Sequence, residues 1–136
     1  MELVAPKDEV VLYQVTDGVA HIKLNRPDQI NAFNIEMRDV LFQTLELYRD
    51  DNEAKVAIIS GEGGRGFCAG ADMDGLAATS QGESQGSQLE AEERNYETNG
   101  VKGFDGGFSY FPTVPKPIIA AINGPAAGVG FIMALY

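Results

Sequence analysis

The chain has 136 residues, of which ten are Lys or Arg and twenty are Asp or Glu, so its net charge is −10 at pH 7. This length suits one domain. The acidic balance argues against a nucleic-acid binder, because such proteins present a basic stripe to the phosphates. No apolar run approaches the roughly 18 residues that span a bilayer, so no membrane segment is expected.

The N-terminal residues and the cysteine content bear on the cellular location of the protein. The first nine residues show no secretory or Arg-rich targeting pattern, and the single cysteine, Cys68, excludes an internal disulfide. We therefore expect a cytoplasmic protein.

Residues 128–136 are apolar and have none of the signals that usually end a helix. We expect residues 1–136 to be the N-terminal portion of a single longer domain.

A hairpin is predicted near the N-terminus. Residues 10–15 and 19–24 are apolar runs on either side of Asp17-Gly18, which is a strong hairpin signal. In the second run, alternation places His21 and Lys23 on the solvent face. His21 is the only histidine and would be a candidate base, but this placement argues for an ordinary surface residue.

The hydrophobic period then changes and predicts a helix over 34–50, with Asn34 as its N-cap. Residues 54–60 and 117–122 are nearly unbroken apolar runs, typical of parallel strands that helices cover on both faces. This order of elements predicts an α/β layered fold. Between the two runs, residues 75–109 hold seven of the sixteen glycines and are predicted to form a mobile flap.

Residues 61–66 fit the G-x-G-x-x-G pattern of dinucleotide-binding loops. In that motif a helix begins at once and an acidic residue follows a second strand. Here Phe67-Cys68-Ala69-Gly70 follows, and neither feature is present. A plain glycine turn is therefore favoured over a nicotinamide-cofactor site.

Two strand-to-loop junctions carry a more specific signal. Residues 67–73 and 121–130 are rich in Gly and Ala, which leaves their backbone bare where the strands end. The second junction is expected to run into a helix whose first N–H groups are free. Two converging N–H groups form an oxyanion hole, which stabilises charge on a carbonyl oxygen.

Three motifs in this order resemble the enoyl-CoA hydratase/isomerase (crotonase) superfamily over almost the whole chain from residue 10. They are Asn25-Arg26-Pro27 with Asn31-Ala32-Phe33, then residues 66–72, then residues 116–126. The resemblance implies a ββα spiral core, here truncated before its C-terminal part. It also implies an acyl-CoA thioester substrate, no separate cofactor because coenzyme A belongs to the substrate, no metal, and assembly as homotrimers or hexamers.

The resemblance places the two oxyanion donors at the backbone N–H groups of Ala71 and Val129, the second position usually being glycine. It also implies that the substrate contacts Asn31, Ala32, Ala69, Ala71, Asp72, Met73, Asp74, Gly128 and Val129. Ile132 stands where hydratases of the family have a glutamate, and a second glutamate would lie beyond Tyr136. The expected activity is enoyl-CoA hydration or Δ3-Δ2-enoyl-CoA isomerisation, and with one carboxylate rather than two the isomerisation is easier to support. A catalytically silent acyl-CoA-binding or interaction module is the alternative.

Some residues allow two interpretations. Cys68 is favoured as a small buried filler over a nucleophile, because no basic partner is near it in sequence. Asp72 is favoured as a loop-shaping or capping residue over a catalytic carboxylate. Lys23 and Arg26 would form ion pairs or contact the phosphates of coenzyme A. Met73 would line the acyl pocket or anchor the flap.

Overall fold

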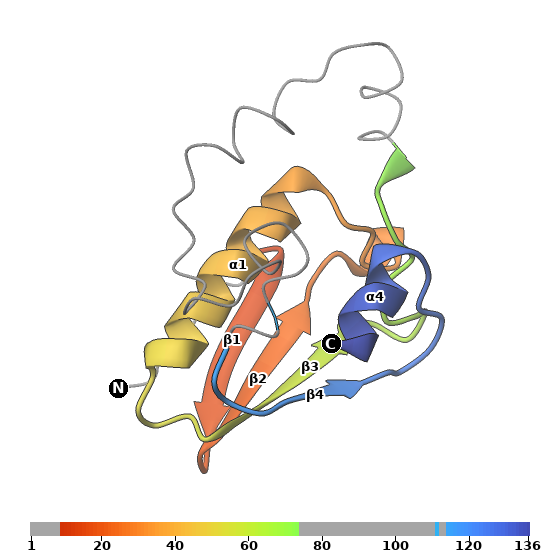
Figure 1. Cartoon of the computed structure of the whole chain (residues 1–136). Helices are drawn as coiled ribbons and strands as arrows, with labels where there is room; N and C mark the ends of the chain where they lie inside the picture. The colour runs from red at the N-terminus through yellow and green to blue at the C-terminus, as the bar shows by residue number, and fades with distance from the viewer. Residues whose placement is uncertain (1–8, 74–110, 112–113) are drawn as a thin grey trace.

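The computed structural model describes residues 9–73, 111 and 114–136 (Figure 1). The predicted flap and Asp74 lie outside the described residues. The elements, in chain order, are β1 (Val11–Thr16), β2 (Val19–Leu24), the 3₁₀ turn η1 (Pro27–Gln29), α1 (Ile35–Asp50), β3 (Val56–Gly61), β4 (Ile118–Ala121) and α4 (Val129–Leu135). The predicted α/β fold is confirmed.

The strands form one mixed sheet in the order β1-β2-β3-β4. β1 and β2 are antiparallel, whereas β2, β3 and β4 run parallel. The hairpin turns at Asp17 and Gly18, whose φ angles of 51° and 82° suit the mirror-image turns that match strand twist. This register buries one face of β2 and leaves His21 and Lys23 partly exposed on the other, as predicted.

Helix α1 begins as the sequence predicts. The side chain of Asn34 accepts a hydrogen bond of 2.8 Å from the N–H of Met37, which satisfies a free donor of the first turn. The inner face of the helix carries the buried residues Met37, Leu41, Thr44, Leu45 and Tyr48. These side chains pack on the sheet, and all but Thr44 belong to the hydrophobic core.

The other end of α1 is tied to the start of β4. The ammonium group of Lys116 donates to the carbonyl oxygens of Tyr48 at 2.8 Å, Asp51 at 2.6 Å and Ala54 at 3.1 Å. A positive charge is favourable there because unpaired carbonyls gather at the end of a helix. Lys116 thereby links the C-terminal end of α1 to the segment just before β4.

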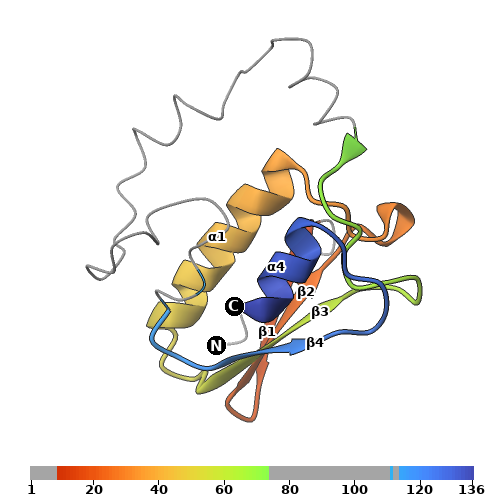
Figure 2. The same ribbon diagram turned by 45° about the vertical axis from the view of Figure 1, so that its right-hand side comes forward.

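One prediction about the sheet is wrong. The apolar runs predicted helices on both faces, but in the described part of the chain α1 and α4 lie on the same side (Figure 2). Ile119, which faces the other side, is 56% exposed. An apolar run shows that the side chains are hydrophobic but does not show what covers them. Which face of the sheet the helices cover therefore depends on the tertiary structure.

Among the described residues, no helix has the length and apolarity to cross a membrane.

The last helix is partly buried. Met133 is 2% exposed, because it lies about one turn after Gly130, on the inner face of α4. A Cβ atom on Gly130 would lie 2.6 Å from the Cβ atom of Cys68, so the helix packs closely there. Phe131, Ile132 and Leu135 are exposed.

Candidate functional site

Three loops meet where the parallel strands end. Because β2, β3 and β4 run parallel, their carboxyl ends share one edge of the sheet. The loops at residues 25–34, 62–72 and 122–128 all leave from this edge (Figure 1). Open α/β sheets bind ligands beyond the carboxyl ends of their strands. The candidate site therefore consists of these three loops.

Asn31 joins the first loop to the second. Its side chain is fully buried, and its Nδ2 donates to the carbonyl oxygens of Glu62 at 3.1 Å and Gly66 at 3.3 Å. Its Oδ1 accepts from the N–H of Arg26 at 2.9 Å. This side chain is thus committed to the scaffold.

The third loop lies beside the second. Asn123 Nδ2 donates to the carbonyl oxygen of Gly61 at 2.9 Å, and the carbonyl oxygen of Pro125 accepts from the N–H groups of Phe67 and Cys68 at 3.0 and 3.2 Å. An isolated parallel bridge pairs Cys68 with Ala126. The segment after the glycine turn is therefore extended, and the helix that a dinucleotide site requires does not begin there.

The first predicted donor, the N–H of Ala71, points away from the first loop. The carbonyl oxygen of Gly70 accepts from the N–H of Phe33 at 2.7 Å, and the N–H of Asp72 donates back to Phe33 at 2.9 Å. The peptide between Gly70 and Ala71 is trans and planar, so its N–H points opposite to its C=O. The N–H of Ala71 thus faces the side of the third loop, and no described residue accepts a hydrogen bond from it.

The second predicted donor, the N–H of Val129, is the first of helix α4. The carbonyl oxygen of Gly128 accepts from the N–H groups of Phe131 and Ile132, both at 3.1 Å, and therefore points along the helix. By the same peptide geometry, the N–H of Val129 points out of the helix start. No acceptor for it lies among the described residues.

The two donors leave from glycine turns that touch. Gly70 and Gly128 both have positive φ angles, 100° and 52°, which favour glycine. A Cβ atom on Gly70 would lie 3.0 Å from the carbonyl oxygen of Ala127, and one on Gly128 would lie 3.6 Å from the Cα atom of Gly70. The turns approach closely because they carry no side chains. They bring to one edge of the sheet two N–H groups that have no acceptor in the part of the chain that the structure describes.

Two cations beside the loops are paired with carboxylates. Arg26 lies 2.8 Å from Asp72, each side chain being 16% exposed, and it also donates to the carbonyl oxygen of Ala32. Lys23 lies 3.0 Å from Glu62 in a more exposed pair. Both basic residues therefore form the ion pairs that one of their two interpretations predicts, and Asp72 is the partner of Arg26.

The remaining predicted contact residues are at the surface. Ala69 and Ala71 are exposed, Ala32 is partly buried, and Met73 is 75% exposed. Ile132, at the position of the family's glutamate, is 45% exposed on α4. Small or accessible residues at the mouth of the three loops leave the backbone open to a ligand.

Cys68 is a buried filler, as predicted. It is fully buried beneath Gly130, and burial raises the pKa of its thiol, against a smaller lowering by a hydrogen bond with the backbone of Gly70. The thiolate is the reactive form of cysteine, so this environment disfavours nucleophilic chemistry.

We expect Cys68 to react slowly with a thiol reagent such as 5,5′-dithiobis(2-nitrobenzoate) at pH 8 in the folded protein. In denaturant the same thiol should react at the rate of a small-molecule thiol, because burial no longer suppresses ionisation. The time course of the released chromophore measures both rates. Rapid labelling of the native protein would contradict the buried placement.

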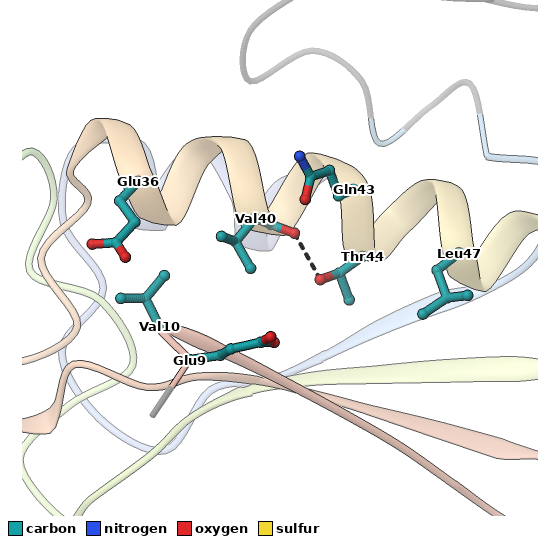
Figure 3. Close-up of a pocket in the computed structure, with 7 residues that line it drawn as sticks. All are labelled: Glu9, Val10, Glu36, Val40, Gln43, Thr44 and Leu47. Atoms are coloured by element: carbon teal, nitrogen blue, oxygen red, sulfur yellow. Dashed lines mark hydrogen bonds between the residues drawn. The ribbon is translucent and has the colours of Figure 1, made fainter. Parts of the chain in front are cut away.

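A separate hollow lies between α1 and residues 9–10, which precede β1 (Figure 3). It has a volume of about 270 Å³ and is lined by Glu9, Val10, Glu36, Val40, Gln43, Thr44 and Leu47. Its charged side chains are both carboxylates, which would repel an anionic ligand. No residue of the three loops lines it. The described residues contain no cluster of three metal-ligating side chains.

Comparisons with known proteins agree with this architecture. Residues 14–136 match the family model described as enoyl-CoA hydratase/isomerase. The chain is 32% identical over 127 residues to 1,2-epoxyphenylacetyl-CoA isomerase of Escherichia coli, covering 93% of the chain and 45% of the relative. It is 30% identical over 129 residues to small ribosomal subunit protein mS47 of Schizosaccharomyces pombe, covering 95% of the chain and 28% of that relative.

A solved structure shows the same fold. The enoyl-CoA hydratase of Bacillus anthracis superposes with a TM-score of 0.73 at 26% identity, covering 93% of the chain and 45% of that structure. The chain thus spans less than half the length of these relatives. The three loops described above fall within the matched part.

Proposed function

Because the chain belongs to the enoyl-CoA hydratase/isomerase family, we propose that the protein carrying it is an acyl-CoA enzyme with an oxyanion hole. In this proposal the N–H groups of Ala71 and Val129 bind the thioester carbonyl oxygen. When a proton leaves the carbon next to the carbonyl, negative charge moves onto that oxygen. The two donors stabilise the resulting enolate.

The observation that supports this proposal is the contact between the Gly70 and Gly128 turns. Each turn directs one N–H group away from its own hydrogen-bonded carbonyl, and neither group has an acceptor among the described residues. Preorganised donors of this kind need no rearrangement when charge develops, which is the source of their effect on rate.

The side chains around these donors bear on which reaction follows. Ile132 cannot move a proton, although the family resemblance places a hydratase glutamate at this position. The neighbouring carboxylate of Asp72 is paired with Arg26 at 2.8 Å, so we do not assign proton transfer to it. With one of two glutamates replaced, isomerisation of a 3-enoyl-CoA by proton transfer is better supported than addition of water, which uses both.

A second candidate function is acyl-CoA binding or protein interaction without turnover. Ile132 favours it, since it removes one of the acid–base groups. The similarity to a protein named as a ribosomal subunit component also favours it. Assembly into trimers or hexamers is part of both proposals and is measurable by light scattering on the eluted protein.

The test uses protein expressed from its complete gene. Titration with butyryl-CoA and with NADH should show binding of the thioester alone. Butyryl-CoA is saturated and cannot be hydrated or isomerised, so incubation in D₂O isolates the enolate step. Mass spectrometry should then detect deuterium next to the carbonyl. Binding without exchange would favour the silent acyl-CoA-binding module. Failure to bind butyryl-CoA would contradict the enzyme and the acyl-CoA-binding module alike, and would leave protein interaction as the function.

A further inference from the structure

We propose that Arg26 and Asp72 are a positioning pair that orients the N–H of Ala71 and neutralises the carboxylate beside it. This inference rests on the proposed function, because it assigns a role to residues that do not touch the reacting atoms. Neither residue acts on the substrate in this proposal. Both act through the backbone turn between Gly70 and Asp72.

The pair closes a ring of contacts around Ala71. On the backbone, Phe33 is hydrogen-bonded to the residues on either side of Ala71, through Gly70 at 2.7 Å and Asp72 at 2.9 Å. On the side chains, Arg26 binds Asp72 at 2.8 Å and also donates to the carbonyl oxygen of Ala32, the residue before Phe33. One guanidinium therefore ties the two segments whose register sets the direction of the Ala71 N–H.

Arg26 can do this because its own backbone is fixed. Its N–H donates to Oδ1 of the buried Asn31 at 2.9 Å, and its carbonyl oxygen accepts from the N–H of Asn31 at 2.8 Å. Both side chains of the ion pair are only 16% exposed, so water competes less for them than for an exposed pair such as Lys23 and Glu62. A planar guanidinium with several donors suits two acceptors at once.

Charge gives the pair a second role. Asp72 directly follows Ala71, so its carboxylate is a negative charge close to where an enolate oxygen would form. Two negative charges near each other in a partly buried site repel strongly. Arg26 compensates this carboxylate, and the local field then favours the enolate. Loss of Arg26 should therefore harm catalysis more than loss of Asp72.

The test compares Arg26→Met, Arg26→Lys, Asp72→Asn and the double variant Arg26→Met/Asp72→Asn in the deuterium-exchange assay with butyryl-CoA. Arg26→Met should lower the exchange rate at saturation by about 10²-fold, since a displaced group next to the chemistry costs that much. The half-saturating concentration should change far less. Arg26→Lys and Asp72→Asn should lower the exchange rate by a smaller factor. The double variant should exchange roughly tenfold faster than Arg26→Met.

Arg49→Met is the matched control. Arg49 pairs with Asp50 at 2.9 Å near the C-terminal end of α1, a helix of 16 residues that is about 24 Å long. The same substitution there should leave exchange unchanged. A purely structural role for Arg26 would give no recovery in the double variant, and unchanged exchange in Arg26→Met would overturn the proposal.

A second readout does not depend on activity. Amide hydrogen exchange, followed by NMR in the free protein, should be faster for the N–H groups of Phe33 and Asp72 in Arg26→Met than in the wild type. If the wild type is inactive but these amides exchange faster in Arg26→Met, the proposed function is wrong and the positioning pair is supported. If the wild type is active and the amides do not respond, the positioning pair is wrong.

Discussion

Replacement of Val129 by proline is expected to lower turnover by about 10²- to 10³-fold while acyl-CoA binding remains measurable. Proline removes one of the two proposed oxyanion donors. It is well suited to this position, because Val129 is the first residue of α4, where the N–H has no helical acceptor and the fixed φ of proline matches the helix. Gly128, which precedes it, has no Cβ atom to clash with the proline ring.

Val129→Ala is the matched control for this experiment. It removes the branched side chain but keeps the N–H, so turnover should stay within a few-fold of the wild type. Steady-state rates with an enoyl-CoA and binding titrations with butyryl-CoA separate loss of chemistry from loss of affinity. Equal turnover in the proline and alanine variants would show that the Val129 N–H is not a donor.

Replacement of Asn31 by alanine is expected to destabilise the protein by about 3 kcal/mol. The change leaves the N–H of Arg26 and the carbonyl oxygens of Glu62 and Gly66 without their partner, and each unsatisfied buried group costs about 1–3 kcal/mol. Asn31 also has a φ of 54°, a conformation that asparagine adopts more easily than alanine. Because water can partly reach these three groups, we expect the total destabilisation to stay at the lower end of their combined cost.

Urea unfolding followed by circular dichroism measures this loss as a shift of the midpoint. Asn52→Ala is the control, because Asn52 is exposed at the end of α1, and surface changes usually stay within about 0.5 kcal/mol. An equal, small effect of both substitutions would show that Asn31 does not hold the first two loops together.

Much of the fold could be predicted because its signals are local. The Asp17-Gly18 turn, the period of α1 and the cap at Asn34 each depend on residues that are neighbours in sequence, and the structure confirms all three. The family was equally accessible, since the three motifs keep their order and spacing along the chain. The positions proposed for the donors followed from that resemblance.

The sequence did not predict that Arg26 pairs with Asp72. The sequence offered ion pairing for Arg26 and loop shaping for Asp72, but it could not show that each is the partner of the other. A salt bridge between residues so distant in the chain depends on how the loops fold back at the sheet edge. The Asn25-Arg26-Pro27 motif was the available signal. It drew attention to Arg26 but could not identify Asp72 as its partner.

By itself the sequence determined the strands, the first helix, the family and the glycine turns, because propensity and motif spacing are properties of the chain alone. Only the tertiary structure decided that Gly70 and Gly128 touch, that Met133 is buried while Ile119 is exposed, and which way the Ala71 N–H points. The reason is physical. A peptide direction is fixed by the hydrogen bond of its carbonyl, here to Phe33, and that partner is chosen by packing between segments far apart in sequence.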